Sequence, residues 1–287
     1  MHPKPSKALA ANGIATSNQP RGLASTGRSK NLNKQGSFIP KHPILIINLQ
    51  RSPDRLEYMR GQLLGVGLDF ERIDGVDGAN LNEKILEQMQ KQSRKSFLHY
   101  AVLNAGEIGC AMSWHKVWTQ IAEQEAAARI ALEDDVELAD NFVSCTSKLL
   151  AAPIENIIID LSGKKGFLPV ERKTINGIKL VRYQTPPLKN QGQIYGKQAC
   201  QILLNKAQNF KAPVDTLQQM HWLHNVQTWS LEVGCLRHQD AAVGGSTITT
   251  SKKPLIAKLK KELSRPLWRG FVVIRNFLKR KNKDFSK

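Results

Sequence analysis

Three acidic residues stand side by side in this chain: Glu133, Asp134 and Asp135, directly after the apolar run 126–132. Carboxylates this close raise one another's pKa, so ionising all of them next to a buried strand requires a neutralising partner. Hard divalent cations take oxygen ligands and commonly bridge one or two protein carboxylates to phosphate groups. We therefore expect Mn²⁺ or Mg²⁺ on Glu133 and Asp135, as in an enzyme whose leaving group is a nucleotide diphosphate. The alternative is a solvated acidic turn.

Two arginines, Arg51 and Arg55, lie four residues apart at the start of a predicted helix that follows the first strand. Ligands of α/β proteins bind beyond the carboxyl ends of the strands, so these arginines could contact the base, ribose or phosphates of a nucleotide. Asp54 either joins that site or pairs with an arginine of the same turn. Asn48 is polar in an apolar strand and, if buried, needs either the nucleotide or the backbone as a partner.

The scaffold for these residues is predicted from an alternation of strands and helices. The run 44–49 is continuously apolar, as is typical of a strand covered on both faces. Behind it the predicted elements are a helix from Pro53 to about Leu64, a strand at 68–73, helices at 81–94 and 107–125, and a strand ending at 132. This β-α-β-α-α-β order favours an α/β sandwich with a mainly parallel sheet.

The second half of the chain gives weaker signals. The pattern predicts a strand at 154–161 and helices at 197–209 and from about 213 to 224. Between 164 and 193 the chain is polar, with a tight turn at Asn176-Gly177, and we interpret it as a lid or acceptor loop.

Charge is concentrated at the two ends of the chain. Residues 1–40 carry +6 and residues 251–287 carry +11, which leaves +1 of the total +18 to residues 41–250. A near-neutral body argues against a nucleic-acid-binding domain, although basic arms could still touch a polyanion or an anionic membrane. We predict a disordered basic leader at 1–40, a catalytic domain at 41–250 and a basic amphipathic tail at 251–287.

The four cysteines form no Cys-x-x-Cys pair, and no secretory signal core or apolar run of about 18 residues is present in the sequence. We expect reduced thiols in a cytoplasmic protein that is soluble or peripheral to a membrane. In the tail, apolar residues recur at helical spacing among cations, at positions 255, 256, 259, 263, 267, 271, 274 and 278. Such a helix either anchors in the plane of an anionic membrane or packs on the body as a solvated cationic helix.

Three segments resemble glycosyltransferase family 25. They are the Ile-Asn-Leu-x-Arg start at 47–55, the second-strand segment at 67–78 that ends in Val-Asp-Gly, and the Gly-Glu-Ile-Gly-Cys-Ala-Met-Ser segment at 106–113 followed by Leu-Glu-Asp-Asp at 132–135. Each piece is weak alone, but their order over 43–142 is specific. The family includes lipooligosaccharide β-galactosyltransferases of Gram-negative bacteria and collagen galactosyltransferases of animals.

The resemblance implies a GT-A-like nucleotide-sugar-binding sandwich, an inverting transfer, and a metal motif made by Glu133 and Asp135. The expected donor is a UDP-sugar, most simply UDP-galactose, and the expected acceptor is the glycolipid core of lipooligosaccharide or lipopolysaccharide at the inner face of the cytoplasmic membrane. One departure stands out: the family has His directly after Ser113, where this chain has Trp114. A member that binds nucleotide-sugar without turnover is therefore the alternative.

Roles follow for the remaining acidic residues. Asp77 is a ribose ligand by resemblance, and Asp134, on the opposite side of an extended segment from Asp135, meets the ribose or donor sugar, or is a solvated or capping residue. Inversion needs a group that takes the acceptor's proton. Asp215, ahead of the Trp- and His-rich segment 220–224, is the first candidate for that base. Asp160 and Asp240 remain open.

Overall fold

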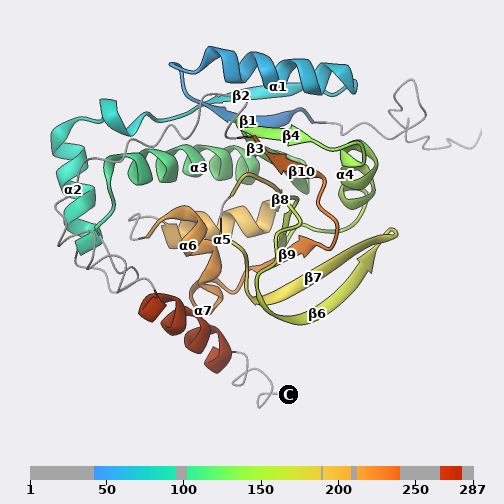
Figure 1. The fold of residues 1–287 in the computed structure, drawn as a ribbon. Helices are drawn as coiled ribbons and strands as arrows, with labels where there is room; N and C mark the ends of the chain where they lie inside the picture. The colour runs from blue at the N-terminus through green and yellow to red at the C-terminus, as the bar shows by residue number, and fades with distance from the viewer. Residues whose placement is uncertain (1–41, 95–101, 189, 208–211, 240–265, 280–287) are drawn as a thin grey trace, which may run out of the picture. The chain divides into compact units, whose positions relative to one another are not determined.

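The computed structural model describes residues 42–94, 102–188, 190–207, 212–239 and 266–279, all within one unit of the chain, residues 31–287. Its main sheet has the strand order β2-β1-β3-β8-β5-β9-β7-β6. Helices cover both faces of this sheet (Figure 1). The predicted α/β, GT-A-like sandwich is thus confirmed.

The first three strands are parallel neighbours and come from the half of the chain that the sequence predicted well. They are β1 (Ile44–Asn48), β2 (Phe70–Asp74) and β3 (Ala128–Glu133). Helix α1 (Pro53–Gly65) joins β1 to β2. Its first turn starts with Pro53, whose fixed φ suits a helix start. Since β1 pairs in parallel with both β2 and β3, all three strands end at the same edge of the sheet.

The other half of the sheet is mixed. Strand β8 (Gly192–Gly196) lies between β3 and β5 (Ile157–Asp160) and is antiparallel to both. Strand β9 (Gln227–Leu231) is parallel to β5, and the long hairpin β6 (Phe167–Ile175) and β7 (Ile178–Thr185) continues the sheet beyond it. The tight turn at Asn176-Gly177 is confirmed. The segment 164–193, interpreted from sequence as a lid or acceptor loop, forms this hairpin around the predicted turn and supplies the start of β8.

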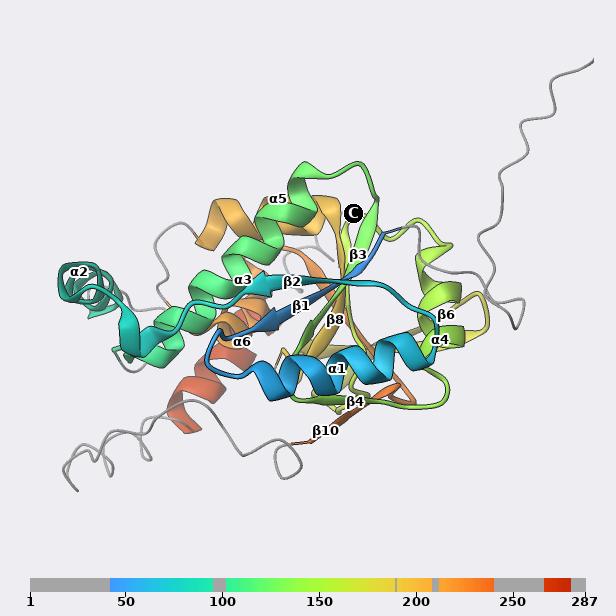
Figure 2. The ribbon, with the colours of Figure 1, turned by 90° about the horizontal axis from the view of Figure 1, so that it is seen from above.

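Side chains alternate between two hydrophobic cores, one on each face of the sheet. Ile44 and Ile46 of β1 face a core with α1 and α4 (Phe142–Leu150), whereas Leu45 faces a core with α3 (Ala105–Glu123) and α5 (Lys197–Ala207). Figure 2 shows α1 on one side of the strands and α3 and α5 on the other. This period of two explains why continuous apolar runs form the central strands.

Smaller elements complete the described chain: η1 (Gly78–Asn80), α2 (Glu83–Arg94), the paired strands β4 (Val136–Leu138) and β10 (Leu236–His238), α6 (Val214–Gln219) and α7 (His221–His224). A helix at 266–279 packs against α6 and α7. The described residues contain no helix long and apolar enough to cross a membrane. The predicted leader, the tail outside 266–279 and Asp240 lie outside the described residues.

Candidate functional site

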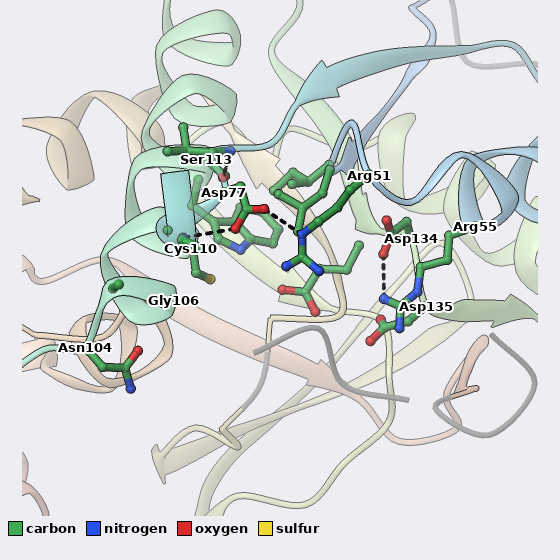
Figure 3. A pocket seen from close by; sticks show the side chains of 17 residues that line it. Arg51, Arg55, Asp77, Asn104, Gly106, Cys110, Ser113, Asp134 and Asp135 are labelled. Atoms are coloured by element: carbon green, nitrogen blue, oxygen red, sulfur yellow. Dashed lines mark hydrogen bonds and ion pairs between the residues drawn. The ribbon is translucent and has the colours of Figure 1, made fainter. Parts of the chain in front are cut away.

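A pocket of about 290 Å³ lies where β1, β2 and β3 end and α3 begins. Its lining includes residues from β1, β3 and α3 and from the loop that follows β2 (Figure 3). Carboxyl ends of parallel strands next to a helix N-terminus are a common ligand site in α/β proteins. Of the residues predicted from sequence, the pocket collects Arg51, Arg55, Asp77, Glu133, Asp134 and Asp135.

The backbone holds Glu133 and Asp135 in place from two directions. The Glu133 amide donates to the carbonyl of Gln191, which precedes β8, at 2.8 Å, and the Asp135 carbonyl accepts from the Gln239 amide at 3.0 Å. The two carboxylates are therefore presented to the pocket from a segment that is pinned by later parts of the chain.

The protonation of Glu133 reflects its surroundings. Burial and, to a smaller extent, the carboxylate of Asp135 raise its pKa to about 8, against a hydrogen bond from the indole of Trp114. Two adjacent oxygen-donor groups of which one resists ionisation fit a hard dication, because the ion would stabilise both charges. In the part of the chain that the structure describes, no three His, Cys, Asp or Glu side chains gather as a metal cage. An ion here would take its remaining ligands from phosphate or water.

Asp134 faces a different set of partners from those expected. Its Oδ1 accepts from Arg55 Nη1 at 3.1 Å and its Oδ2 accepts from Asn48 Nδ2 at 2.7 Å. Asn48 Nδ2 also donates to the Ser52 carbonyl at 2.8 Å, and Asn48 Oδ1 accepts from Arg72 Nε at 3.1 Å. Asn48, Arg55 and Asp134 thus form a buried polar bracket that ties β1, α1 and the end of β3 together.

Arg51 is held toward the pocket by Asp77. The distance from Arg51 Nε to Asp77 Oδ2 is 2.6 Å, and Asp77 Oδ1 accepts from the Ala79 amide at 3.1 Å at the start of η1. Burial alone would raise the pKa of Asp77, but the hydrogen bonds from Ala79 and Arg51 outweigh it, so the pKa is lowered. Asp77 therefore stays ionised and keeps the guanidinium in place at the rim.

The first turn of α3 forms one wall of the pocket. Asn104 and Glu107 make a reciprocal capping box, with the Glu107 amide donating to Asn104 Oδ1 and the Asn104 amide donating to Glu107 Oε2, each at 2.9 Å. Ala105 and Gly106, between them, line the pocket. A helix N-terminus favours an anionic ligand through its amides and its dipole. Glu107 is accordingly a helix-capping residue.

The Gly-Cys-Ala-Met-Ser motif positions α3 against the loop that follows β2. A Cβ on Gly109 would lie 2.5 Å from the Val76 carbonyl oxygen, which only glycine avoids. One turn later, Ser113 Oγ accepts from the Val76 amide at 2.8 Å and donates to the Gly109 carbonyl at 2.8 Å. The motif thus fixes the loop that carries Asp77, and neither Ser113 nor Cys110 is presented as a nucleophile, since burial, Glu133 and Asp215 raise the pKa of the Cys110 thiol.

The remaining predicted residues are distributed unevenly. Asp215 lies in the first turn of α6 and does not line the pocket, but its charge helps to raise the pKa of Glu133 and of Cys110, so the fold brings it near both residues. Asp160 is 2% exposed at the end of β5, with a pKa that burial raises to about 6. Asp54 is exposed in the first turn of α1 and does not line the pocket. Asn48 lies behind the lining, among its own protein partners.

Sequence reasoning missed the role of Trp114. The indole, 1% exposed, lines the pocket and donates to Glu133, and its ring lies 5.5 Å from that of Tyr195. The Tyr195 hydroxyl accepts from Gln218 Nε2 of α6 at 2.7 Å. Trp114 therefore connects the acidic residues to α6, the helix that carries Asp215. The available signal was its departure from the family pattern, which did not indicate what the side chain contacts.

Comparison with known proteins gives a consistent result. The family model described as glycosyltransferase family 25 (LPS biosynthesis protein) matches residues 41–212. A glycosyltransferase 25 family member of Drosophila pseudoobscura pseudoobscura is 30% identical over 102 residues, 34% of this chain and 16% of that protein. The inactive glycosyltransferase 25 family member 3 of Mus musculus is 28% identical over 155 residues, 52% of this chain and 26% of that protein.

Human procollagen galactosyltransferase 2 is 29% identical over 124 residues, 40% of this chain and 20% of that protein. The chain thus spans only 16% to 26% of the length of these animal relatives. They are animal members of the family, and the bacterial galactosyltransferases also named with the resemblance are not among them. The matched residues 41–212 contain the pocket with its acidic residues, Arg51 and the motif of α3. The chain belongs to glycosyltransferase family 25.

Proposed function

We propose that this chain is a metal-dependent inverting glycosyltransferase that moves galactose from UDP-galactose onto a lipooligosaccharide or lipopolysaccharide core at the inner face of the cytoplasmic membrane. The observation that carries this proposal is the pair Glu133 and Asp135 in the lining of the pocket, together with Arg51 and the first turn of α3. These groups match a diphosphate: oxygen ligands for Mn²⁺ or Mg²⁺, a guanidinium, and a helix N-terminus.

Each residue has a part in the transfer. The ion, when bound, acts as a Lewis acid that stabilises the charge building up on the departing UDP. Glu133 and Asp135 hold it, and Arg51, positioned by Asp77, meets the nucleotide. The acceptor hydroxyl oxygen bonds to the anomeric carbon as the bond from that carbon to the UDP oxygen breaks, and Asp215 takes the hydroxyl proton. Asp134, Arg55 and Asn48 support this site from behind.

A second candidate function is nucleotide-sugar binding without turnover. Trp114 stands where the family has His and places an indole N–H on Glu133, a carboxylate assigned to the ion. A hydrogen bond at that oxygen competes with metal ligation. The family contains both active and inactive proteins by name: one relative compared above is called an inactive glycosyltransferase 25 family member, and another is called a procollagen galactosyltransferase.

UDP release separates these functions. The purified chain is incubated with UDP-galactose, Mn²⁺ and truncated lipooligosaccharide, beside UDP-glucose and UDP-N-acetylglucosamine as alternative donors. We expect UDP release that Asp135→Asn lowers by about a hundredfold to a thousandfold, the size of effect for a lost charge-stabilising group. Asp140→Asn, an exposed carboxylate five residues on, is the matched control and should retain activity. UDP binding without release would favour the second candidate, and nucleic-acid binding indifferent to Asp135→Asn would contradict both.

A further inference from the structure

The helix at 266–279 has two faces of different character. Toward the body, Val272 is 1% exposed and Asn276 is 4% exposed. Asn276 Nδ2 donates to the carbonyls of Gln184 at 3.1 Å and Gln219 at 2.9 Å. A buried side-chain amide that donates hydrogen bonds to two backbone carbonyls is a specific contact, so the helix has a defined orientation on the protein.

Aromatic rings complete this attachment. The Phe271 ring centroid lies 6.0 Å from that of Trp222 in α7 and 5.2 Å from that of Trp268. The Arg275 guanidinium lies 6.0 Å from the Trp222 ring, at cation–π distance. Because α7 directly follows α6, the helix is anchored next to the element whose first turn carries Asp215.

The opposite face is apolar and exposed. Leu267 is 77% exposed, Ile274 58% and Leu278 51%. They are seven and four residues apart, which places them on one side of a helix. Leucine and isoleucine side chains gathered on one helix face in water mark an interaction surface. We call these three residues the outer stripe.

The positive charge of this helix distinguishes between the possible binding partners of the outer stripe. Residues 266–279 contain Arg269, Arg275 and Lys279 and no Asp or Glu. A second copy of the same helix would bring identical cations together, and residues 251–265, at +5, would repel the helix in the same way. Nucleic acid would satisfy the cations but leave the aliphatic side chains in water. An anionic bilayer satisfies both, because aliphatic side chains enter the acyl region while cations meet the head groups.

We propose that the helix at 266–279 docks in the plane of an anionic lipid bilayer through Leu267, Ile274 and Leu278, with its cations at the head groups. The docking itself needs no catalysis, but its purpose rests on the proposed function: it holds α6 and the pocket near a lipid-linked acceptor. The glycosyl acceptor then reaches Asp215 from the bilayer side.

The test is flotation of the full chain with vesicles of phosphatidylcholine, with and without phosphatidylglycerol. We expect binding only when phosphatidylglycerol is present. The triple variant Leu267→Ser, Ile274→Ser, Leu278→Ser should lose at least about tenfold in partition, and Arg269→Gln with Lys279→Gln roughly fivefold for each charge. The matched control is Leu64→Ser with Val233→Ser, which changes exposed aliphatic residues elsewhere, 56% and 74% exposed, and should bind as the parent does.

Several outcomes would overturn the inference. The first is vesicle binding that is unchanged in the triple variant. The second is a parent protein that is a dimer in vesicle-free solution while the triple variant is a monomer. The third is nucleic acid that displaces the parent and the triple variant from vesicles to the same extent. Circular dichroism of each variant shows that the fold is retained. Vesicle binding without UDP release would leave the docking intact and contradict the proposed function. UDP release on a soluble acceptor without vesicle binding would support the proposed function and contradict the docking.

Discussion

Polar side chains in the loops that follow β1 and β2 line a pocket, whereas a row of polar side chains across β5, β8 and β9 is buried. In the first region Arg51 is 46% exposed on its side chain and Asp77 16%. In the second, Gln193, Asp160 and Ser230 stand in one row across three strands and are each at most 3% exposed. Gln193 Nε2 donates to Gln218 Oε1 of α6 at 3.1 Å.

This difference separates binding from positioning. Charges at the pocket can change partner when a ligand arrives, because water already reaches them. Buried polar groups cannot do so without cost, since each lost hydrogen bond leaves a desolvated group. We infer that the first region recognises the nucleotide, and that the second sets where α6 and Asp215 lie. If binding and positioning are divided in this way, substitutions in buried polar groups should cost more unfolding free energy than substitutions at the pocket rim.

The largest effect is expected from the buried bracket, a charged part of the pocket region that is buried like the second region. Asp134→Ala removes a carboxylate partner from Arg55, whose side chain is 7% exposed, and should cost about 3–5 kcal/mol of unfolding free energy in urea. Glu57→Ala, which breaks the exposed pair with Arg60, should cost less than about 1 kcal/mol. Equal costs would show that the bracket is not a structural unit.

Next in size is the contact between α3 and the loop after β2. Gly109→Ala puts a methyl group 2.5 Å from the Val76 carbonyl oxygen and should lower the unfolding free energy by about 1–3 kcal/mol. It should also weaken UDP binding, because the displaced loop carries Asp77. Gly61→Ala in α1, with no atom within 4 Å of the new Cβ, should instead stabilise the protein by about 0.5–1 kcal/mol. Calorimetry with UDP and thermal melts measure both.

A pH dependence should come from the second region. His224 Nδ1 accepts from the Val226 amide at 3.0 Å while Nε2 donates to the Leu217 carbonyl at 3.1 Å, so the folded protein needs a neutral ring. Burial lowers the pKa of His224 to about 3 and that of His221 to about 4. Since the unfolded chain binds these protons near pH 6.5, stability should fall as pH drops below that value, by up to about 1.4 kcal/mol per pH unit per histidine.

Asp160 acts in the opposite direction. Burial raises its pKa to about 6, so the folded state holds a proton that the unfolded state releases near pH 4, and this term weakens the protein as pH rises between those values. Urea unfolding at several pH values should show a shallower acid-side loss in His224→Gln and a steeper one in Asp160→Asn. Parallel curves for all three proteins would exclude these groups as the source.

The smallest effect on stability is expected at the pocket rim. Arg51→Ala removes an exposed ion pair and should change the unfolding free energy by less than about 1 kcal/mol. If Arg51 contacts the nucleotide, the same change should raise the Kd for UDP about tenfold, as for a lost charged hydrogen bond. Arg60→Ala, exposed on α1, is the control for both titrations. A large stability loss with unchanged UDP affinity would show that Arg51 stabilises the fold and does not bind the nucleotide.

The pocket region was the more predictable of the two because its signals are local. The apolar run of β1, the Pro53 helix start and the acidic residues at the end of β3 can each be recognised from a few neighbouring residues. Strand β8 cannot. Gly192 and Gly196 are poor strand formers, but a Cβ on Gly196 would clash with the carbonyl oxygens of Ile154 and Glu155, and a Cβ on Gly192 would clash with the side chains of Leu132 and Leu236. Such contacts between distant parts of the chain have no local pattern.

The same limit applies to the site. Sequence reasoning placed carboxylates and arginines at the strand ends, where parallel strands put them. It left Asn48 open between the nucleotide and the backbone, and Asp134 open between the ligand and a solvated or capping role, because it could not see that these two side chains bond to each other across 86 residues. It named Asp215 as the first candidate for the base, but the packing of α6 on Tyr195 and Trp114, which sets the position of Asp215, has no local signal in the sequence.

The central position of β8 has a consequence for how the chain is made. In the described part of the molecule, the two halves of the sheet are joined through this strand, which follows both β3 and β5 in the sequence. During synthesis, β3 and β5 therefore emerge with open edges that β8 closes only later. Open strand edges recruit other chains, so fragments that stop before residue 192 should aggregate, and the nascent protein depends on protection until that strand arrives.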